Sequence, residues 1–265
     1  MHVAIIGGTG VDRLPGVNLE EQVIDTPYGQ VMIHRAGGSP YPLIFLNRHG
    51  PQTQTPPHKI NFRANLKALQ MLGVERILAT NAVGSIDPNL PPGSLVALDD
   101  YLDFTAGRRF TFYDGAESGH AYTDMNDPYC PELRRRLLAM ASEFELELHP
   151  RGTYVCTNGP RFETPAEIRM FARLGGEVVG MTGVPEAALA KELGIHYAAV
   201  AYSINWAAGL EEGIRIVREG IPELLARLLA LFIRTLQSPE PMGCSCASAV
   251  HMIQPPQEEG GAYRG

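Results

Sequence analysis

The stretch from Gly159 to Glu192 constrains the fold most, because it combines a strand-like run with two helix starts within 34 residues. Thr164 is followed by a proline and, three residues later, by Glu167, which is the pattern of a capping box with proline in the first helical position. This helix is expected to end at Gly175–Gly176, before a short apolar strand at 178–179. A second helix is expected from residue 185. Strand ends next to helix N-termini are where α/β proteins bind anions and small molecules.

The composition narrows the class of protein. A chain of 265 residues is long enough for a full core. Its net charge of −7 argues against a nucleic-acid partner, since phosphates select basic surfaces. The most apolar run, 224–233, contains Arg227 and is too short to span a bilayer, and the first residues lack a basic leader. We therefore expect a cytoplasmic protein without a membrane partner.

The first residues predict a phosphate site. The apolar run 3–6 precedes Gly7-Gly8-Thr9-Gly10, a turn whose backbone N–H groups and Thr9 hydroxyl can surround a phosphate. A dinucleotide fingerprint would need a third glycine where Arg13 stands. The missing glycine argues against a nucleotide-binding module or dehydrogenase, which is the alternative function from another class. A plain strand and loop is the other alternative.

Further elements follow in alternation. The pattern predicts short strands at 22–25, 31–35 and 42–47, strands at 76–80, 93–100, 152–157 and 195–204, and helices at 61–72, 131–146 and 222–236. Arg48-His49 ends the third strand, and arginine offers a planar fork of donors that suits phosphate oxygens. From residue 238 the composition changes to Pro, Gly, Ser and Cys, which predicts a mobile tail at 238–265.

Two motifs carry a family resemblance. Gly-Pro-Arg-Phe-Glu-Thr at 159–164 and Gly-Met-Thr-Gly-Val-Pro-Glu at 180–186 resemble the trimeric purine nucleoside phosphorylases and their methylthioadenosine and methylthioinosine relatives. The resemblance covers residues 3–236. It implies a single nucleoside phosphorylase domain over 1–237, of three α/β/α layers with a mixed central sheet. It also implies a homotrimer, in which Tyr122, or His120 if the loop alignment slips, reaches the ribose of the neighbouring subunit.

The resemblance implies phosphorolysis of a purine nucleoside, with inorganic phosphate as co-substrate and neither a cofactor nor a metal. Catalysis would then depend on positioning phosphate and on stabilising charge on the departing purine. By matching motifs, phosphate would be held by Thr9, Arg48, His49, the Asn81-Ala82 loop and Thr182. Met181 would lie under the ribose, Phe162 and Glu163 would meet the base, and Asn205 would donate to N7. Without the resemblance, Glu163 is equally explained as a carboxylate in the first turn of its helix, where the helix dipole favours a negative charge. Asn205 is then an ordinary residue at the end of a strand.

The sequence departs in two places from the enzymes that it resembles, and these differences point to a subfamily. Methylthioadenosine phosphorylases carry aspartates after the last strand, whereas this chain has Asn205, and they lack an acid matching Glu163. Ordinary nucleoside phosphorylases bind the 5′-hydroxyl with a histidine, and none occurs between 209 and 223. Ile214, Ile216 and Val217 are available instead, which favours an apolar 5′ substituent and S-methyl-5′-thioinosine as substrate. A general inosine/guanosine phosphorylase is the first alternative, and a methylthioadenosine phosphorylase is the second.

The four cysteines stand at 130, 156, 244 and 246. Cys244-Ser-Cys246 is interpreted first as two incidental thiols. A disulfide, as in the Cys-x-Cys pairs of some heat-stable relatives, and half of a metal site are the alternatives. One Cys-x-Cys alone cannot close a tetrahedral zinc site.

Overall fold

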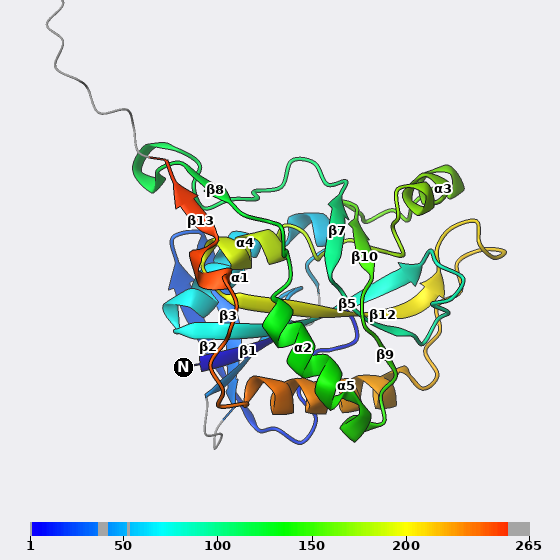
Figure 1. Cartoon of the computed structure of the whole chain (residues 1–265), viewed down its shortest axis with the longest axis horizontal. Helices are drawn as coiled ribbons and strands as arrows, with labels where there is room; N and C mark the ends of the chain where they lie inside the picture. Colours follow the sequence, from blue (N-terminus) through cyan, green and yellow to red (C-terminus); the bar gives the residue numbers. More distant parts are fainter. Residues whose placement is uncertain (1, 37–41, 52–53, 254–265) are drawn as a thin grey trace, which may run out of the picture.

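The computed structural model describes residues 2–36, 42–51 and 54–253 (Figure 1). Its helices are α1 (Phe62–Met71), α2 (Pro131–Met140), α3 (Pro165–Arg173), α4 (Glu186–Glu192) and α5 (Ile221–Leu236). Its strands are β1 (His2–Gly7), β2 (Leu19–Thr26), β3 (Gly29–Ala36), β4 (Leu43–Asn47), β5 (Val74–Ser85), β6 (Leu95–Ala97), β7 (Asp100–Asp103), β8 (Ala121–Thr123), β9 (Leu148–His149), β10 (Thr153–Cys156), β11 (Val178–Gly180), β12 (His196–Trp206) and β13 (Val250–Met252).

Strand β5 is the centre of a mixed sheet. It pairs in parallel with β1 and with β12, and its last residues pair antiparallel with β11. The order β2-β3-β4-β1-β5-β11-β10-β7 runs through it, while β12 continues to β6 and β9. The predicted mixed central sheet is confirmed. The sequence did not predict β7, β8, β9 or β13, because runs of two to four residues give too little alternation to recognise.

Helices cover both faces of this sheet, as expected for three layers (Figure 1). In β1 the side chains alternate, so that Ala4 and Ile6 join the core under α1 and α4, while Val3 and Ile5 join the core under α2 and α5. Both cores are therefore built on the same strands. Within the described residues, no helix is long and apolar enough to cross a membrane.

Helix α3 begins as its sequence predicts. The Thr164 hydroxyl accepts from the Glu167 N–H, and the Glu167 carboxylate accepts from the Thr164 N–H, which completes the capping box. The helix expected at 131–146 is shorter. α2 ends at Met140, and one 3₁₀ turn (Ala141–Phe144) continues to Glu145, whose φ of 54° is left-handed. A left-handed residue ends a helix.

The expectation of a mobile tail from residue 238 is wrong for residues 238–253. Two buried arginines, Arg76 and Arg136, each 3% exposed, take their acceptors from this segment. Arg76 donates to the carbonyls of Ser238 (2.6 Å) and Glu240 (2.7 Å), and Arg136 donates to those of Glu240 (3.1 Å) and Pro241 (2.6 Å). A buried guanidinium needs such partners, so the segment is held on the body of the protein. Farther along, β13 pairs with β8. Residues 254–265 lie outside the described residues.

Replacing Arg136 tests this anchoring. Arg136→Met leaves the Pro241 carbonyl without a charged donor and the Glu240 carbonyl with Arg76 alone, so we expect the free energy of unfolding to fall by about 3 kcal/mol. Arg135→Met is the matched control on the same helix, because Arg135 is 65% exposed and its ion pair with Glu132 contributes less than about 1 kcal/mol. Denaturant unfolding measures both variants. Equal losses in the two would show that the segment is not anchored through Arg136.

Candidate active site

One cavity lies where the ends of several strands meet, and most of the predicted site residues line it. Those are Thr9, Arg48, His49, Ala82, Phe162, Glu163, Met181, Thr182, Asn205 and Ile214. Ile216, which was named with Ile214, also lines the cavity. Its other lining residues were not predicted as site residues: Pro57, Val83, Gly84, Val179, Gly180, Ile204, Ala207 and Ala208. We call the part of the lining formed by Thr9, Arg48, His49 and Thr182 its polar end, and the part formed by Ile214 and Ile216 its apolar end.

Arg48 is the buried charge at the polar end. Its Nε and Nη2 donate to the two carboxylate oxygens of Glu186 at 2.7 and 2.6 Å, and both side chains are completely buried. Nη1 donates to the Thr80 carbonyl at 2.7 Å, and the Tyr197 hydroxyl donates to Glu186 at 2.7 Å. Burial by itself lowers the pKa of Arg48, but the Glu186 charge and hydrogen bonds raise it above its ordinary value. A guanidinium has five N–H donors, so two remain to serve a ligand in the cavity.

The glycine loop after β1 meets this arginine. The Gly8 N–H donates to the Thr80 hydroxyl at 2.9 Å. A Cβ at Gly8 would stand 2.7 Å from the Thr80 carbonyl oxygen and 2.8 Å from Arg48 Nη1, so only glycine fits there. The Tyr202 hydroxyl donates to the Thr9 carbonyl. The loop is therefore fixed from both sides, with Thr9 facing the cavity.

His49 adds a neutral imidazole. Its Nδ1 lies 2.8 Å from the Thr55 carbonyl, so Nδ1 carries the proton and donates it. Burial lowers the pKa of His49 below its ordinary value. At neutral pH its Nε2 is consequently an acceptor, suited to an O–H group such as that of a protonated phosphate.

Asn81 on β5 and Thr182 after β11 meet at the same end. Asn81 Nδ2 donates to the Thr182 hydroxyl at 3.2 Å. The Tyr154 hydroxyl accepts from the backbone N–H groups of Thr182 (3.1 Å) and Gly183 (3.2 Å). Asn81 thus acts on the cavity through Thr182, and Ala82 next to it lines the wall.

Glu163 and Asn205 are polar groups of the remaining wall. Glu163 is 8% exposed, and its Oε1 accepts from the Thr157 hydroxyl at 2.6 Å, which orients the carboxylate. Asn205 is 4% exposed and donates from Nδ2 to the Trp206 carbonyl at 2.7 Å. This hydrogen bond identifies the amide nitrogen, whose second N–H can serve a ligand. A Cβ at Gly84 would lie 3.1 Å from that nitrogen, so the glycine lets the amide approach.

Arg108 was not predicted as a site residue, yet it ties the two motif loops together. Its guanidinium donates to the carbonyls of Val184, Met181 (2.7 Å), Thr157 (3.3 Å) and Asn158 (3.3 Å). Backbone carbonyls leave no trace in a sequence, so only the run Arg108-Arg109 after an irregular stretch hinted at this contact.

Three predicted site residues, Asn81, Val217 and Tyr122, do not line the cavity. Val217 does not line it; its N–H donates to the Ile204 carbonyl at 2.7 Å and holds the loop that carries Ile214 and Ile216. The side chains of a loop need not alternate as in a strand, so the sequence could not choose among the three. Tyr122 lies on β8, is 62% exposed and packs against His120 with ring centroids 5.0 Å apart. Its predicted contact with a neighbouring subunit stays a prediction.

Replacing Glu186 tests the buried ion pair. Glu186→Gln leaves the guanidinium buried without its countercharge, so we expect a loss of about 3–5 kcal/mol in the free energy of unfolding. Glu192→Gln on the same helix is the control. The Glu192 carboxylate accepts from the Phe112 N–H at 2.7 Å, which the glutamine oxygen can also do, and burial raises the pKa of this carboxyl. Similar stability of the two variants would contradict the importance of the Arg48–Glu186 pair.

Comparison with known proteins identifies the family. The model of the phosphorylase superfamily matches residues 2–236. The 6-oxopurine nucleoside phosphorylase of Pyrococcus furiosus is 47% identical over 259 residues, which cover 94% of this chain and 97% of that protein. A probable S-methyl-5′-thioinosine phosphorylase of Methanopyrus kandleri is 43% identical over 254 residues, with the same coverages of 94% and 97%.

Solved structures give the same result. The methylthioadenosine phosphorylase of Schistosoma mansoni in complex with tubercidin superposes with a TM-score of 0.81 and 30% sequence identity, covering 89% of this chain and 90% of that chain. Sequence, fold and the polar cavity at the strand ends therefore agree. The chain belongs to the phosphorylase superfamily, in its purine nucleoside phosphorylase branch.

Proposed function

We propose that this protein catalyses the phosphorolysis of a 6-oxopurine nucleoside with an apolar 5′ group, S-methyl-5′-thioinosine above all. The bond between C1′ and N9 breaks, its electron pair goes to the purine, and a phosphate oxygen forms the new bond to C1′. The products are hypoxanthine and 5-methylthioribose 1-phosphate. The observation that carries this proposal is one cavity in which Arg48, Glu163 and Asn205 face apolar walls.

The phosphate belongs at the polar end. Arg48 is held rigidly by Glu186, and its two remaining donors, together with Thr9 and Thr182, suit phosphate oxygens. The neutral His49 accepts from the O–H of a protonated phosphate. Because these groups are already oriented, little reorganisation is needed as phosphate captures the cationic sugar.

The purine belongs between Glu163 and Asn205. A 6-oxopurine carries a proton on N1, which the second oxygen of the Glu163 carboxylate can accept while the first keeps its bond from Thr157. Asn205 Nδ2 keeps its bond to the Trp206 carbonyl and can donate its second N–H to N7 as negative charge develops there. Phe162 supplies an apolar surface for the ring. Adenine would place the lone pair of N1 against the carboxylate.

Base selectivity follows from these two residues. We expect the wild type to prefer methylthioinosine to methylthioadenosine by on the order of 10³-fold in kcat/KM, because adenine leaves buried polar groups unpaired. Asn205→Asp should reduce this preference, since a protonated aspartate can donate to N7 and accept from the 6-amino group.

Glu163→Gln should lower kcat/KM for the 6-oxopurine nucleoside by about tenfold or more without changing the KM for phosphate. Glu167→Gln is the matched control, because Glu167 lies outside the cavity and glutamine can also complete a capping box. Steady-state assays compare both variants with the wild type, with the nucleoside varied at saturating phosphate and with phosphate varied at a fixed nucleoside concentration. A wild type that prefers the adenine nucleoside would refute the roles of Glu163 and Asn205.

The 5′ end of the nucleoside belongs at the isoleucines. Ile214 and Ile216 line the cavity, so a methylthio group gains about 1 kcal/mol or more from burial beside them, whereas a buried hydroxyl loses about 1–3 kcal/mol. We expect methylthioinosine to exceed inosine in kcat/KM by at least about tenfold. Ile214→Ser should reduce this ratio, and Leu210→Ala, outside the cavity on the same loop, should not.

A general 6-oxopurine nucleoside phosphorylase is the second candidate. Ile214 and Ile216 are 36% and 45% exposed, so in the isolated chain a 5′-hydroxyl could stay hydrated beside them. The relative in Pyrococcus furiosus also bears that broader name. Equal kcat/KM values for inosine and methylthioinosine would favour this candidate.

The proposal includes a cytoplasmic homotrimer that salvages purines. The exposure of Tyr122 and of the cavity residues Ile214 and Ile216 is the observation that fits a neighbouring subunit closing the site. Sedimentation should give three times 28.9 kDa. A fully active monomer would contradict the trimer and leave the assignment of the base and phosphate ends intact.

A further inference from the structure

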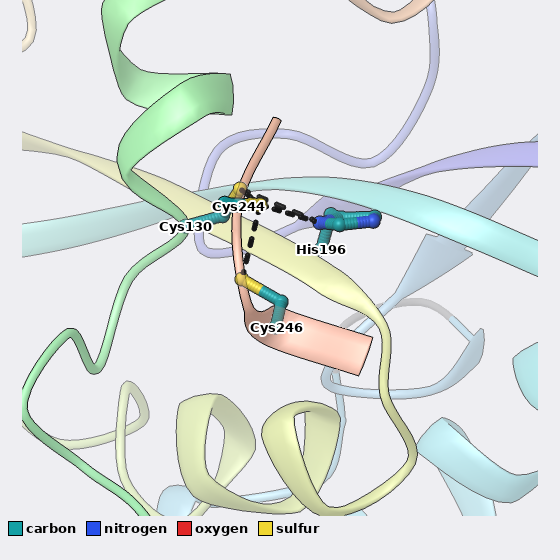
Figure 2. A group of neighbouring side chains, drawn as sticks. All are labelled: Cys130, His196, Cys244 and Cys246. Atoms are coloured by element: carbon teal, nitrogen blue, oxygen red, sulfur yellow. Dashed lines mark hydrogen bonds between the residues drawn. The ribbon is translucent and has the colours of Figure 1, made fainter. Parts of the chain in front are cut away.

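Three cysteines and a histidine meet far from the cavity. Cys130 is the residue before α2, His196 is the first residue of β12, and Cys244 and Cys246 follow α5 (Figure 2). One ligand atom of each lies within 4.8 Å of those of all the others. The fold therefore assembles a Cys₃His cluster from three distant parts of the chain, which the Cys-x-Cys pair alone could not form.

The dimensions of this cluster are those of a single tetrahedral ion. Cys244 Sγ lies 3.4 Å from Cys130 Sγ, 3.6 Å from Cys246 Sγ and 3.2 Å from His196 Nδ1, and Cys130 Sγ lies 3.6 Å from the same nitrogen. Around zinc, with Zn–S of about 2.3 Å and Zn–N of about 2.0 Å, the S–S edges measure about 3.8 Å and the S–N edges about 3.5 Å. The four atoms could close on one ion with shifts of a fraction of an ångström to about one ångström.

Burial and charge fit a closed structural site. Cys130 and Cys246 are 1% and 2% exposed, and Cys244 and His196 are partly buried. Cys130 Sγ accepts from the Leu133 N–H at the start of α2, where the helix dipole favours a thiolate. Lys191, 5% exposed, interacts electrostatically with Cys246 and offsets part of the negative charge of three thiolates.

A disulfide explains less of this arrangement. It would join two of the three thiols and leave the third beside His196 without a role. A zinc ion uses all four groups, and soft thiolates with one imidazole in a tetrahedral set are typical of zinc. No metal was predicted from the sequence, because Cys130 and His196 lie far from the Cys-x-Cys pair along the chain.

We propose that Cys130, His196, Cys244 and Cys246 bind one structural Zn²⁺ ion that fixes the C-terminal segment to the body of the protein. The ion has four protein ligands and no open position, so it takes no part in the reaction. His196 and Asn205 stand nine residues apart on β12, which places the ion about 30 Å from the end of the cavity at Asn205. Four residues after Cys246, β13 begins and pairs with β8, so the ion also supports the strand that carries Tyr122.

Metal content is the first test. The full chain, purified without chelator, should contain about one zinc per chain by elemental analysis, or take up one when the reduced protein is titrated with Zn²⁺ against a chromogenic chelator. Cys244→Ser, Cys246→Ser and His196→Ala should each lose it. Cys156→Ser is the matched control, because Cys156 is a buried thiol outside the cluster. His196→Cys keeps four ligands and should retain zinc, which keeps the test informative if other variants fail to fold.

Spectroscopy and stability give independent readouts. Cobalt in place of zinc should show the visible absorption of a tetrahedral thiolate complex, which Cys246→Ser should lack. Removing the metal should lower the Tm by about 5 °C or more in the wild type and leave that of Cys246→Ser unchanged. Reduced protein that binds no zinc, or a disulfide among Cys130, Cys244 and Cys246 found by non-reducing peptide mapping of the protein as purified, would overturn the proposal.

Discussion

The ion pair between Arg48 and Glu186 is the interaction on which the cavity depends. Both charges are fully buried, so each is tolerable only in the presence of the other. To pair, they require that the end of β4 and the start of α4 meet, 138 residues apart in the chain. Once they do, the arginine is oriented, the glycine loop must approach it without a side chain, and Thr80 is shared by both. The polar end of the cavity is therefore built around the hydrogen bonds that the buried guanidinium of Arg48 requires.

Other buried cations organise loops in the same way. Arg108 gathers four carbonyls of the two motif loops, and Arg76 and Arg136 gather those of the C-terminal segment. In each case one side chain satisfies several backbone groups that the sheet and helices leave unpaired. Arginines in the body of the fold therefore hold the two motif loops and the C-terminal segment in place. The conformation of these segments depends on the guanidinium donors as well as on their own sequence.

Much of the fold was predictable from local signals. The capping box at Thr164, the glycine loop after β1 and the apolar runs of β1, β11 and β12 each follow from neighbouring residues. Of the thirteen site residues that the family resemblance predicted, ten line one cavity. The partnership of Arg48 with Glu186, the contacts of Arg108 and the meeting of Cys130 with Cys244 were not predictable. They join residues 138, up to 76 and 114 positions apart, and topology, which no local pattern encodes, decides them.

The pairing of β12 with β5 over ten positions has a consequence for how this protein tolerates change. These two paired strands carry the cavity at one end and the Cys₃His cluster at the other, and the two sites share no side chain. Substitutions at sites so far apart contribute to stability almost independently. A change at one end is therefore expected to leave the other end intact, and stability added at the C-terminal end would offset destabilising changes in the cavity.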